Sequence, residues 1–292
     1  MRVKDAIRHI IDSTGDIYGS GESESIAFIV LEFVGFPRKK IFADAEADIG
    51  EEKENFIREV AKELNKNRPI QYILGETEFY GIRLKVDGKV LIPRQETEEL
   101  VQRILRETVK ENPIILDLGT GSGCIAVSLA KNITTAKVYA TDISSAALRI
   151  ARENAELNNI DLTAIEDDIL KTKLPENLRF DIIVSNPPYV RSSEKQFMHA
   201  NVLDFEPAVA LFVSDNDPLL FYRAIAMFAF ERLNGGGKVY VEINENFGPE
   251  VAELFREAGL NDVLIIPDIH EKDRFVSATK KKVVNNTHST KP

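Results

Sequence analysis

The sequence predicts an α/β protein with a mixed, mostly parallel sheet, preceded by a small helical domain. Short apolar runs alternate with amphipathic helical segments from about residue 96 onward, which is typical of parallel βαβ units. Residues 1–69 show only helical spacing of apolar residues. At 292 residues the chain exceeds one typical domain. We therefore expect a helical domain over 1–69, a linking β-hairpin over 70–95, an α/β domain over 96–280 and a disordered tail over 281–292.

Three helices are expected in the first part of the chain. Apolar residues recur at helical spacing over residues 3–11 and 25–34, and a third helix over 51–65 carries Phe56, Val60 and Leu64 on one face. A small helical domain of this kind can recognise a partner or stabilise the domain that follows it, and the sequence leaves both roles open.

The linking hairpin is predicted from alternation and turn chemistry. Residues 79–86 alternate between apolar and polar, Asp87-Gly88 forms a two-residue turn, and residues 89–92 return. A helix over 96–110 is expected to follow.

A glycine-rich turn follows the first predicted strand of the α/β domain. The apolar run 114–118 leads into Gly119-Thr120-Gly121-Ser122-Gly123 and then into a helix, which is typical of a nucleotide-binding βα unit. The dinucleotide fingerprint requires a third small residue at position 124, where Cys124 stands. Asp117 would repel a pyrophosphate but tolerate a cationic ligand without phosphate. S-adenosylmethionine, with its ammonium and sulfonium groups, is such a ligand.

The next two strand ends supply acids for the same ligand. Asp142 closes the second strand, a little over 20 residues after the glycine turn, where a carboxylate can accept both ribose hydroxyls. A helix-capping role is the alternative. The third strand ends before Asp167 and Asp168, one of which could accept from the adenine amine while Ile169 packs on the ring. Adjacent acids in a loop are often only solvated, so both readings stay open.

Asn186-Pro187-Pro188-Tyr189 follows the buried strand predicted over 180–185. Two prolines cannot continue the ladder, because proline lacks an N–H and has a fixed φ. The turn is rich in acceptors, since the prolines keep their carbonyls and Asn186 adds a side-chain oxygen. Such a corner suits a planar –NH2 group held by its hydrogens. Residues 190–217 then form a long insertion, expected to be a lid or a specificity loop.

These motifs together resemble the PrmC/HemK family of class I S-adenosylmethionine-dependent methyltransferases, the release factor glutamine methyltransferases. The segments that narrow the resemblance are Ile92-Pro93-Arg94-Gln95-Glu96-Thr97-Glu98, Tyr72-Ile73-Leu74-Gly75 and Phe205-Glu206-Pro207. The resemblance covers residues 70–279. It implies a Rossmann-like class I methyltransferase fold with one reversed strand near the end of the sheet. The family frequently has proline where Gln95 stands.

The resemblance also implies an activity and roles for residues. Family members transfer a methyl group from S-adenosylmethionine, leaving S-adenosylhomocysteine, to the glutamine amide of the Gly-Gly-Gln motif in class 1 peptide chain release factors. The cofactor residues expected here are Asp117, Gly119, Thr120, Gly121, Ser122, Gly123, Asp142, Asp168, Ile169 and Asn186. Asn186, Pro187 and Tyr189 are expected to act in catalysis, and Pro188, Arg94 and Glu96 join them in binding the glutamine. For Arg94 and Glu96, ordinary charge at a helix N-terminus is the alternative.

Composition agrees with a globular enzyme of the cytoplasm. Hydrophobic residues make up 43% and charged residues 29%, without an apolar run of 18 residues. The single cysteine excludes an internal disulfide and fits a reducing compartment. The four histidines are scattered, so no metal is expected. A net charge of −10 shows no basic footprint for a duplex, so we expect a protein partner and no direct nucleic-acid contact. We also expect no membrane contact and a monomer.

Three other functions compete with this interpretation. Methylation of an adenine nitrogen in DNA or RNA uses a similar conjugated –NH2, but the chain lacks a large basic domain for target reading. A non-catalytic binding protein would not need an intact glycine turn, Asp142 and the Asn-Pro-Pro-Tyr corner. A dinucleotide oxidoreductase is disfavoured by Cys124.

Overall fold

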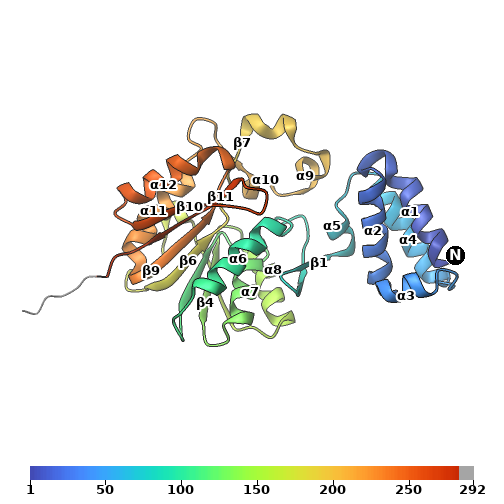
Figure 1. The fold of residues 1–292 in the computed structure, drawn as a ribbon, viewed down its shortest axis with the longest axis horizontal. Helices are drawn as coiled ribbons and strands as arrows, with labels where there is room; N and C mark the ends of the chain where they lie inside the picture. Colours follow the sequence, from blue (N-terminus) through green and yellow to red (C-terminus); the bar gives the residue numbers. More distant parts are fainter. Residues whose placement is uncertain (283–292) are drawn as a thin grey trace, which may run out of the picture. The chain divides into compact units, whose positions relative to one another are not determined.

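The computed structural model describes residues 1–282, so residues 283–292 of the predicted disordered tail lie outside the described residues. The chain divides into two compact units. The first consists of residues 1–77, 86–88 and 198–206, and the second takes the remainder of the described chain. Figure 1 shows the elements of both along the sequence.

The first unit is helical around its own apolar core. Its N-terminal helices are α1 (Val3–Tyr18), α2 (Ser20–Phe33), α3 (Arg38–Ala43), α4 (Glu51–Leu64) and α5 (Ile70–Leu74). Val3, Ile10, Leu31, Ile57 and Leu64 are among its fully buried side chains. The three predicted helices are present, but their buried faces were predicted only in part. In α4, for example, Val60 and Leu64 are buried as predicted, whereas Ile57 is buried and Phe56 only half-buried. The short helices α3 and α5 were not predicted.

The linking hairpin is present but lies earlier in the chain than predicted. Its strands are β1 (Glu76–Phe79) and β2 (Ile82–Lys85), which pair as a separate two-stranded sheet. The turn is Tyr80-Gly81, with φ of 48° and 73°, as a two-residue hairpin turn requires. The chain reverses at Tyr80-Gly81 instead, where the non-glycine residue Tyr80 adopts positive φ. The predicted hairpin turn at Asp87-Gly88 and the return strand over 89–92 are therefore wrong.

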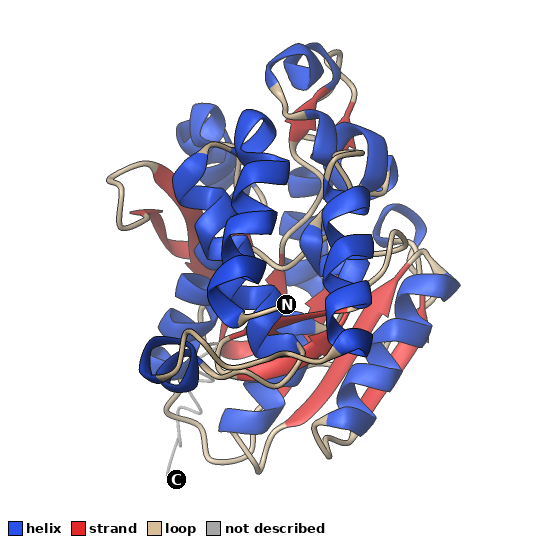
Figure 2. Ribbon diagram, turned by 90° about the vertical axis from the view of Figure 1, so that its right-hand side faces the viewer, coloured by secondary structure: helices blue, strands red, loops and turns tan. Residues whose placement is uncertain are grey.

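The second unit is built on a seven-stranded sheet with the order β10-β11-β9-β6-β3-β4-β5. Its strands are β3 (Ile114–Leu118), β4 (Lys137–Asp142), β5 (Leu162–Glu166), β6 (Phe180–Ser185), β9 (Leu233–Glu242), β10 (Asn261–Pro267) and β11 (Asp273–Thr279). β11 runs antiparallel to both of its neighbours, and the other pairs are parallel. This confirms the predicted class I methyltransferase fold with one reversed strand. Figure 2 shows the strands between helices.

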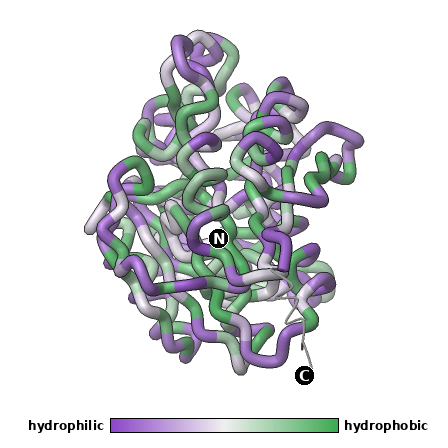
Figure 3. Tube along the Cα trace, turned by 90° about the vertical axis from the view of Figure 1, so that its left-hand side faces the viewer, coloured by the Kyte–Doolittle hydropathy of each residue, from purple (hydrophilic) through white to green (hydrophobic). Residues whose placement is uncertain are grey.

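Helices cover both faces of this sheet. The major ones are α6 (Gln95–Glu107), α7 (Cys124–Asn132), α8 (Ser145–Leu157), α11 (Leu220–Arg232) and α12 (Gly248–Glu257). Successive residues of β3 point to opposite faces, so Ile115 packs in the cluster with α6 and α7, whereas Leu116 packs with α11 and α12. Both faces of β3 thus pack against apolar side chains, and along the rest of the chain hydrophobic and hydrophilic stretches are interspersed (Figure 3).

The predicted insertion over 190–217 is folded into short elements. They are β7 (Val190–Arg191), η2 (Ser192–Phe197), α9 (Ala200–Phe205), α10 (Ala208–Leu211) and β8 (Phe212–Val213), with η1 (Ile169–Lys171) and η3 (Glu245–Phe247) elsewhere in the domain. β7 and β8 pair in parallel, which closes the segment on itself. Val209 and Ala210 of α10 reach the pocket described below.

Candidate active site

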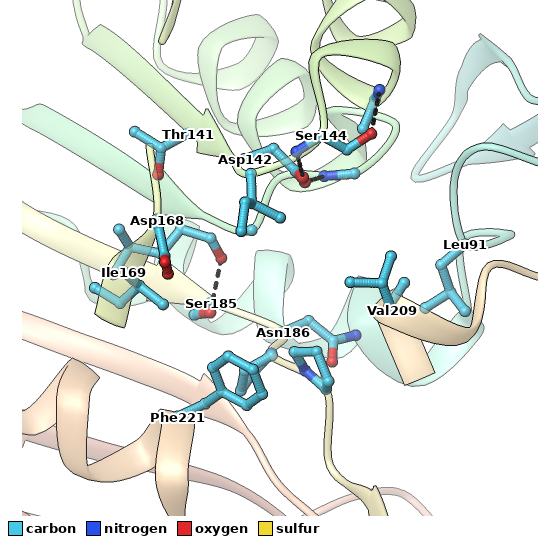
Figure 4. A pocket seen from close by; sticks show the side chains of 18 of the residues that line it. Leu91, Thr141, Asp142, Ser144, Asp168, Ile169, Ser185, Asn186, Val209 and Phe221 are labelled. Carbon is cyan, nitrogen blue, oxygen red and sulfur yellow. Dashed lines mark hydrogen bonds between the residues drawn. The ribbon is translucent and has the colours of Figure 1, made fainter. Parts of the chain in front are cut away.

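A pocket opens at the carboxyl ends of the parallel strands, entirely within the second unit. β3 lies between β4 and β6, so the chain order reverses there, which is where open α/β sheets bind ligands. The residues that follow four strand ends line it: Gly119, Gly121, Asp142, Ile143, Ser144, Asp167, Asp168, Ile169, Asn186, Pro187 and Pro188. Val209 and Phe221 flank Asn186 (Figure 4).

The glycines after β3 serve two different purposes. Gly119 (φ 71°) and Gly121 (φ 55°) line the pocket, and a Cβ at either position would meet nothing within 4 Å. At Gly123 (φ 81°) a Cβ would lie 3.1 Å from the Cβ of Ala151. The first two therefore let the backbone approach a ligand, and the third lets α7 pack closely on α8.

Asp142 connects the glycine turn to the end of β4. One carboxylate oxygen accepts from the Gly121 N–H at 2.9 Å and the other from the Ser144 N–H at 2.8 Å. Ser144 caps α8, its Oγ accepting from the Ala147 N–H at 3.2 Å. The residue that caps α8 is therefore Ser144 and not Asp142. Burial raises the pKa of Asp142, and its carboxylate faces the pocket (Figure 4).

Asp117 lies beneath the glycine turn and is 1% exposed. Its Oδ2 accepts from the Thr120 hydroxyl at 2.7 Å and the Ala126 N–H at 3.2 Å. Its Oδ1 is buried and has no hydrogen-bond partner among residues 1–282. Burial raises the pKa of Asp117 to about 7. A partly protonated acid therefore stands directly under the turn.

The two neighbouring aspartates after β5 are bonded differently. Asp167 accepts from the Thr172 hydroxyl and from the Lys173 N–H, both at 2.7 Å, so both of its oxygens bind the loop. Asp168 accepts from the Leu170 N–H at 2.9 Å through one oxygen. Asp168 and Ile169 both line the pocket. Of the two acids, Asp168 is the one whose second oxygen suits a ligand amine.

The Asn186 corner closes the opposite side of the pocket. Asn186, Pro187 and Pro188 line it. The Asn186 Nδ2 donates to Thr97 Oγ1 at 3.2 Å, and the Thr97 hydroxyl donates to Glu242 Oε2 at 2.7 Å. The Tyr189 hydroxyl donates to Glu242 Oε1 at 3.0 Å. Neither Thr97 nor Glu242 was singled out from the sequence.

Some predicted site residues do not form the pocket wall. Within residues 1–282, the lining does not include Asp117, Thr120, Ser122, Gly123, Tyr189, Arg94 or Glu96. Asp117, Thr120, Ser122 and Gly123 are buried within or beneath the glycine turn, whereas Arg94 and Glu96 are half-buried at the start of α6. Direct contact of these residues with a ligand stays a prediction.

The charges of the side chains that line the pocket fit a cationic ligand without phosphate. Among the residues that the structure describes, three aspartates line the pocket, against one cation, Lys89. An anionic phosphate would be repelled by these acids, whereas an ammonium or sulfonium group would be attracted. The residues present therefore fit S-adenosylmethionine. Among residues 1–282, every helix falls short of the length and apolar character needed to cross a bilayer, and no cluster of three or more potential metal-ligating side chains is present.

Relatives of known name extend over most of the chain. It is 44% identical to the release factor glutamine methyltransferase of Flavobacterium psychrophilum, over 94% of this chain and 98% of the relative. It is also 44% identical to that of Bacteroides thetaiotaomicron, over 93% and 98%. The family described as methyltransferase small domain matches residues 96–210.

Solved structures share the fold at low identity. A methyltransferase from Pyrococcus furiosus superposes with a TM-score of 0.51 at 20% identity, covering 70% of this chain and 91% of that one. The hMettl16 catalytic domain superposes with a TM-score of 0.53 at 15% identity, covering 69% and 76%. The sheet order, the pocket at the β3–β6 reversal and the full-length relatives agree. The chain belongs to the release factor glutamine methyltransferase family.

Proposed function

We propose that this protein transfers a methyl group from S-adenosylmethionine to the side-chain amide nitrogen of the glutamine in the Gly-Gly-Gln motif of class 1 peptide chain release factors. The observation that carries the proposal is that Asn186 and Pro187 line the same pocket as Gly119 and Gly121. A corner that accepts –NH2 hydrogens thus lies beside a turn suited to the cofactor.

The cofactor supplies a methyl group that is already activated by its positive sulfur. The residues of the chain must bind it and aim a nucleophile at it. We assign the ribose hydroxyls to Asp142, the adenine amine to Asp168 and the face of the ring to Ile169, because all three line the pocket at the ends of β4 and β5. Gly119 and Gly121 line the same pocket, where their backbone can approach the cofactor closely.

The Asn186 corner would make the glutamine amide a better nucleophile. An amide nitrogen is weak because its lone pair is delocalised into the carbonyl. Asn186 Oδ1 and the Pro187 carbonyl can each accept one N–H, which places negative dipoles beside a nitrogen that becomes positive as it attacks. The Tyr189 ring was predicted to pack on the glutamine stem, and its hydroxyl is bonded to Glu242.

The test is methylation of a purified release factor with labelled S-adenosylmethionine, followed by mass spectrometry of the product. One methyl group on the motif glutamine is the expected result. A release factor whose motif glutamine is replaced by glutamate serves as the negative control. If duplex DNA or RNA were methylated and the release factor were not, the adenine-nitrogen alternative would be supported instead. We place the reaction in the cytoplasm and assign it to a monomer without nucleic-acid contact.

We also assign recognition of the release factor to the helical unit, residues 1–69. Its α3 carries three consecutive cations, and Phe42 there is 73% exposed with its ring 5.5 Å from that of Phe28. Phe42→Ser should raise KM for the whole release factor while leaving methylation of a short Gly-Gly-Gln peptide unchanged. Ile17→Ser, which removes another exposed apolar side chain of the unit, is the control. Equal effects on both substrates would contradict the assignment.

A further inference from the structure

A buried carboxylate joins three elements behind the Asn186 corner. Glu242 ends β9 and is 1% exposed. Its two oxygens accept from two hydroxyls, Thr97 Oγ1 at 2.7 Å from α6 and the Tyr189 hydroxyl at 3.0 Å from the turn after β6. Burial raises the pKa of Glu242, which shows that a charge at this position is held at a cost. Such a group calls for an explanation beyond packing.

The chemistry of these groups fixes the direction of every hydrogen bond. The Thr97 hydroxyl donates its one hydrogen to Glu242 Oε2, and when Glu242 is ionised no other direction is possible, because a carboxylate can only accept. Thr97 Oγ1 is then left with lone pairs alone toward Asn186. It can therefore face only the –NH2 end of the Asn186 amide, with which it lies at 3.2 Å. The carbonyl end of Asn186 must point the other way.

We propose that Thr97 and Glu242 are positioning residues that hold Asn186 with its carbonyl oxygen directed into the pocket to receive the glutamine amide. The inference rests on the proposed function, in which Asn186 Oδ1 accepts from that amide. An asparagine without this contact could also present its –NH2 group to the substrate, and two –NH2 groups repel. The same carboxylate also holds the Tyr189 ring, so one charge orients both ends of the turn.

A glutamine in place of Glu242 would not give this direction. Its amide has a donor end, which could face Thr97 and make that hydroxyl donate to Asn186 instead. Asn186 would then turn its carbonyl toward Thr97 and its –NH2 toward the pocket. The carboxylate is thus the group in the chain Asn186–Thr97–Glu242 that allows only one orientation.

The test compares Thr97→Val with Thr97→Ser, measuring kcat and KM for a release factor and the Kd of S-adenosylmethionine. Valine keeps the shape but removes the hydroxyl, so kcat should fall roughly 10- to 100-fold, less than the 10²–10³ expected for losing an oriented donor or acceptor outright. Serine keeps the hydroxyl and should restore kcat to within about threefold. The Kd of the cofactor should stay within about twofold in both variants.

Thr14→Val is the matched control, because Thr14 is a fully buried threonine of the helical unit that bonds to Ile10 and Ser23. It should lower the melting temperature about as much as Thr97→Val without a comparable loss of kcat. If Thr97→Val does not fold, Glu242→Gln replaces it with the same measurements and the same expected loss. Unchanged kcat in either folded variant would overturn the proposal.

A double variant separates this inference from the proposed function. If Thr97 acts through Asn186, adding Thr97→Val to Asn186→Ala should slow turnover no further. An additive loss would show that Thr97 acts by another route. If Asn186→Ala itself keeps full turnover, the role of Asn186 fails. If Asn186→Ala loses turnover while Thr97→Val does not, only the positioning inference fails.

Discussion

Asp117 should link cofactor affinity to pH near neutrality. Burial raises its pKa to about 7, and its Oδ1 has no partner among the described residues. The ligand that the pocket fits is cationic, and a nearby positive charge favours the ionised carboxylate. Binding should therefore be strongest when Asp117 is ionised. Because the acid ionises as the pH rises, affinity should increase through pH 7 and level off above it.

The size of the effect follows from the pKa. With a pKa of about 7, about one protein in eleven carries the ionised form at pH 6 and about ten in eleven at pH 8. If only that form binds well, the apparent Kd for S-adenosylmethionine should be about tenfold lower at pH 8 than at pH 6. Asp117→Asn should bind with the weak affinity at both values.

Calorimetric titration of S-adenosylmethionine at pH 6, 7 and 8, in buffers of different ionisation enthalpy, measures both the Kd and the proton release. A Kd that is equal at pH 6 and pH 8, or a variant that keeps the wild-type slope, would refute the reasoning. The pKa of Asp142 is also raised by burial, but both of its oxygens accept from backbone N–H groups, so its variant should weaken binding without removing the slope.

Folding stability gives an independent check on Asp117. The folded pKa of about 7 lies above the ordinary 3.8, so the folded state holds this proton more tightly than the unfolded chain does. Its contribution is therefore fully present below pH 3.8 and is lost as the pH rises through 7. Asp117→Asn should raise the melting temperature of the ligand-free protein at pH 8 while weakening cofactor binding. A lowered melting temperature would indicate that the carboxylate stabilises the turn.

Three further predictions concern the pocket and the glycine turn beside it. Asn186→Ala should lower kcat by roughly 10²–10³ with cofactor Kd unchanged, since it removes one oriented acceptor; undiminished methylation of a release factor would contradict this. Asp142→Ala should weaken cofactor binding at least about tenfold in a fluorescence titration, because it removes the proposed ribose acceptor and the Gly121 contact. Gly123→Ala should destabilise the protein by about 1–3 kcal/mol in urea unfolding, since φ is 81° and the new Cβ would meet Ala151 at 3.1 Å.

Strands β3 and β6 could be predicted because a turn signal marks where each one stops. β3 and β6 were predicted with the bounds they have, since an apolar run stops at a glycine turn in one case and at Asn186-Pro187 in the other. The short helix α3 could not, because six residues with three cations carry no usable periodicity. The hairpin turn was missed because Asp87-Gly88 has the better turn composition, whereas Tyr80 adopts positive φ in context.

The pocket could be predicted for the same reason that parallel sheets bind ligands at one edge. Asp142 ends a strand, and Gly119, Asp168 and Asn186 each come after one, and the carboxyl ends of parallel strands meet. Residues that contact the pocket residues from behind that edge could not be predicted from the sequence. Thr97 belongs to a helix, and its bond to Glu242 joins residues 145 positions apart. Only the packing of α6 against β9 brings them together.

Glu242 nevertheless left a signal in the sequence. β9 pairs in parallel with β6, so its carboxyl end lies at the same edge as Asn186, and a charged residue that closes an apolar strand there needs a partner. The acid could therefore have been assigned to the site by the rule that selected Asp142. Its function could not, because the direction that a carboxylate imposes on an asparagine depends on the one hydroxyl between them. Strand ends predict where functional residues lie, whereas the orientation of the reacting groups depends on contacts between residues that are far apart in the sequence.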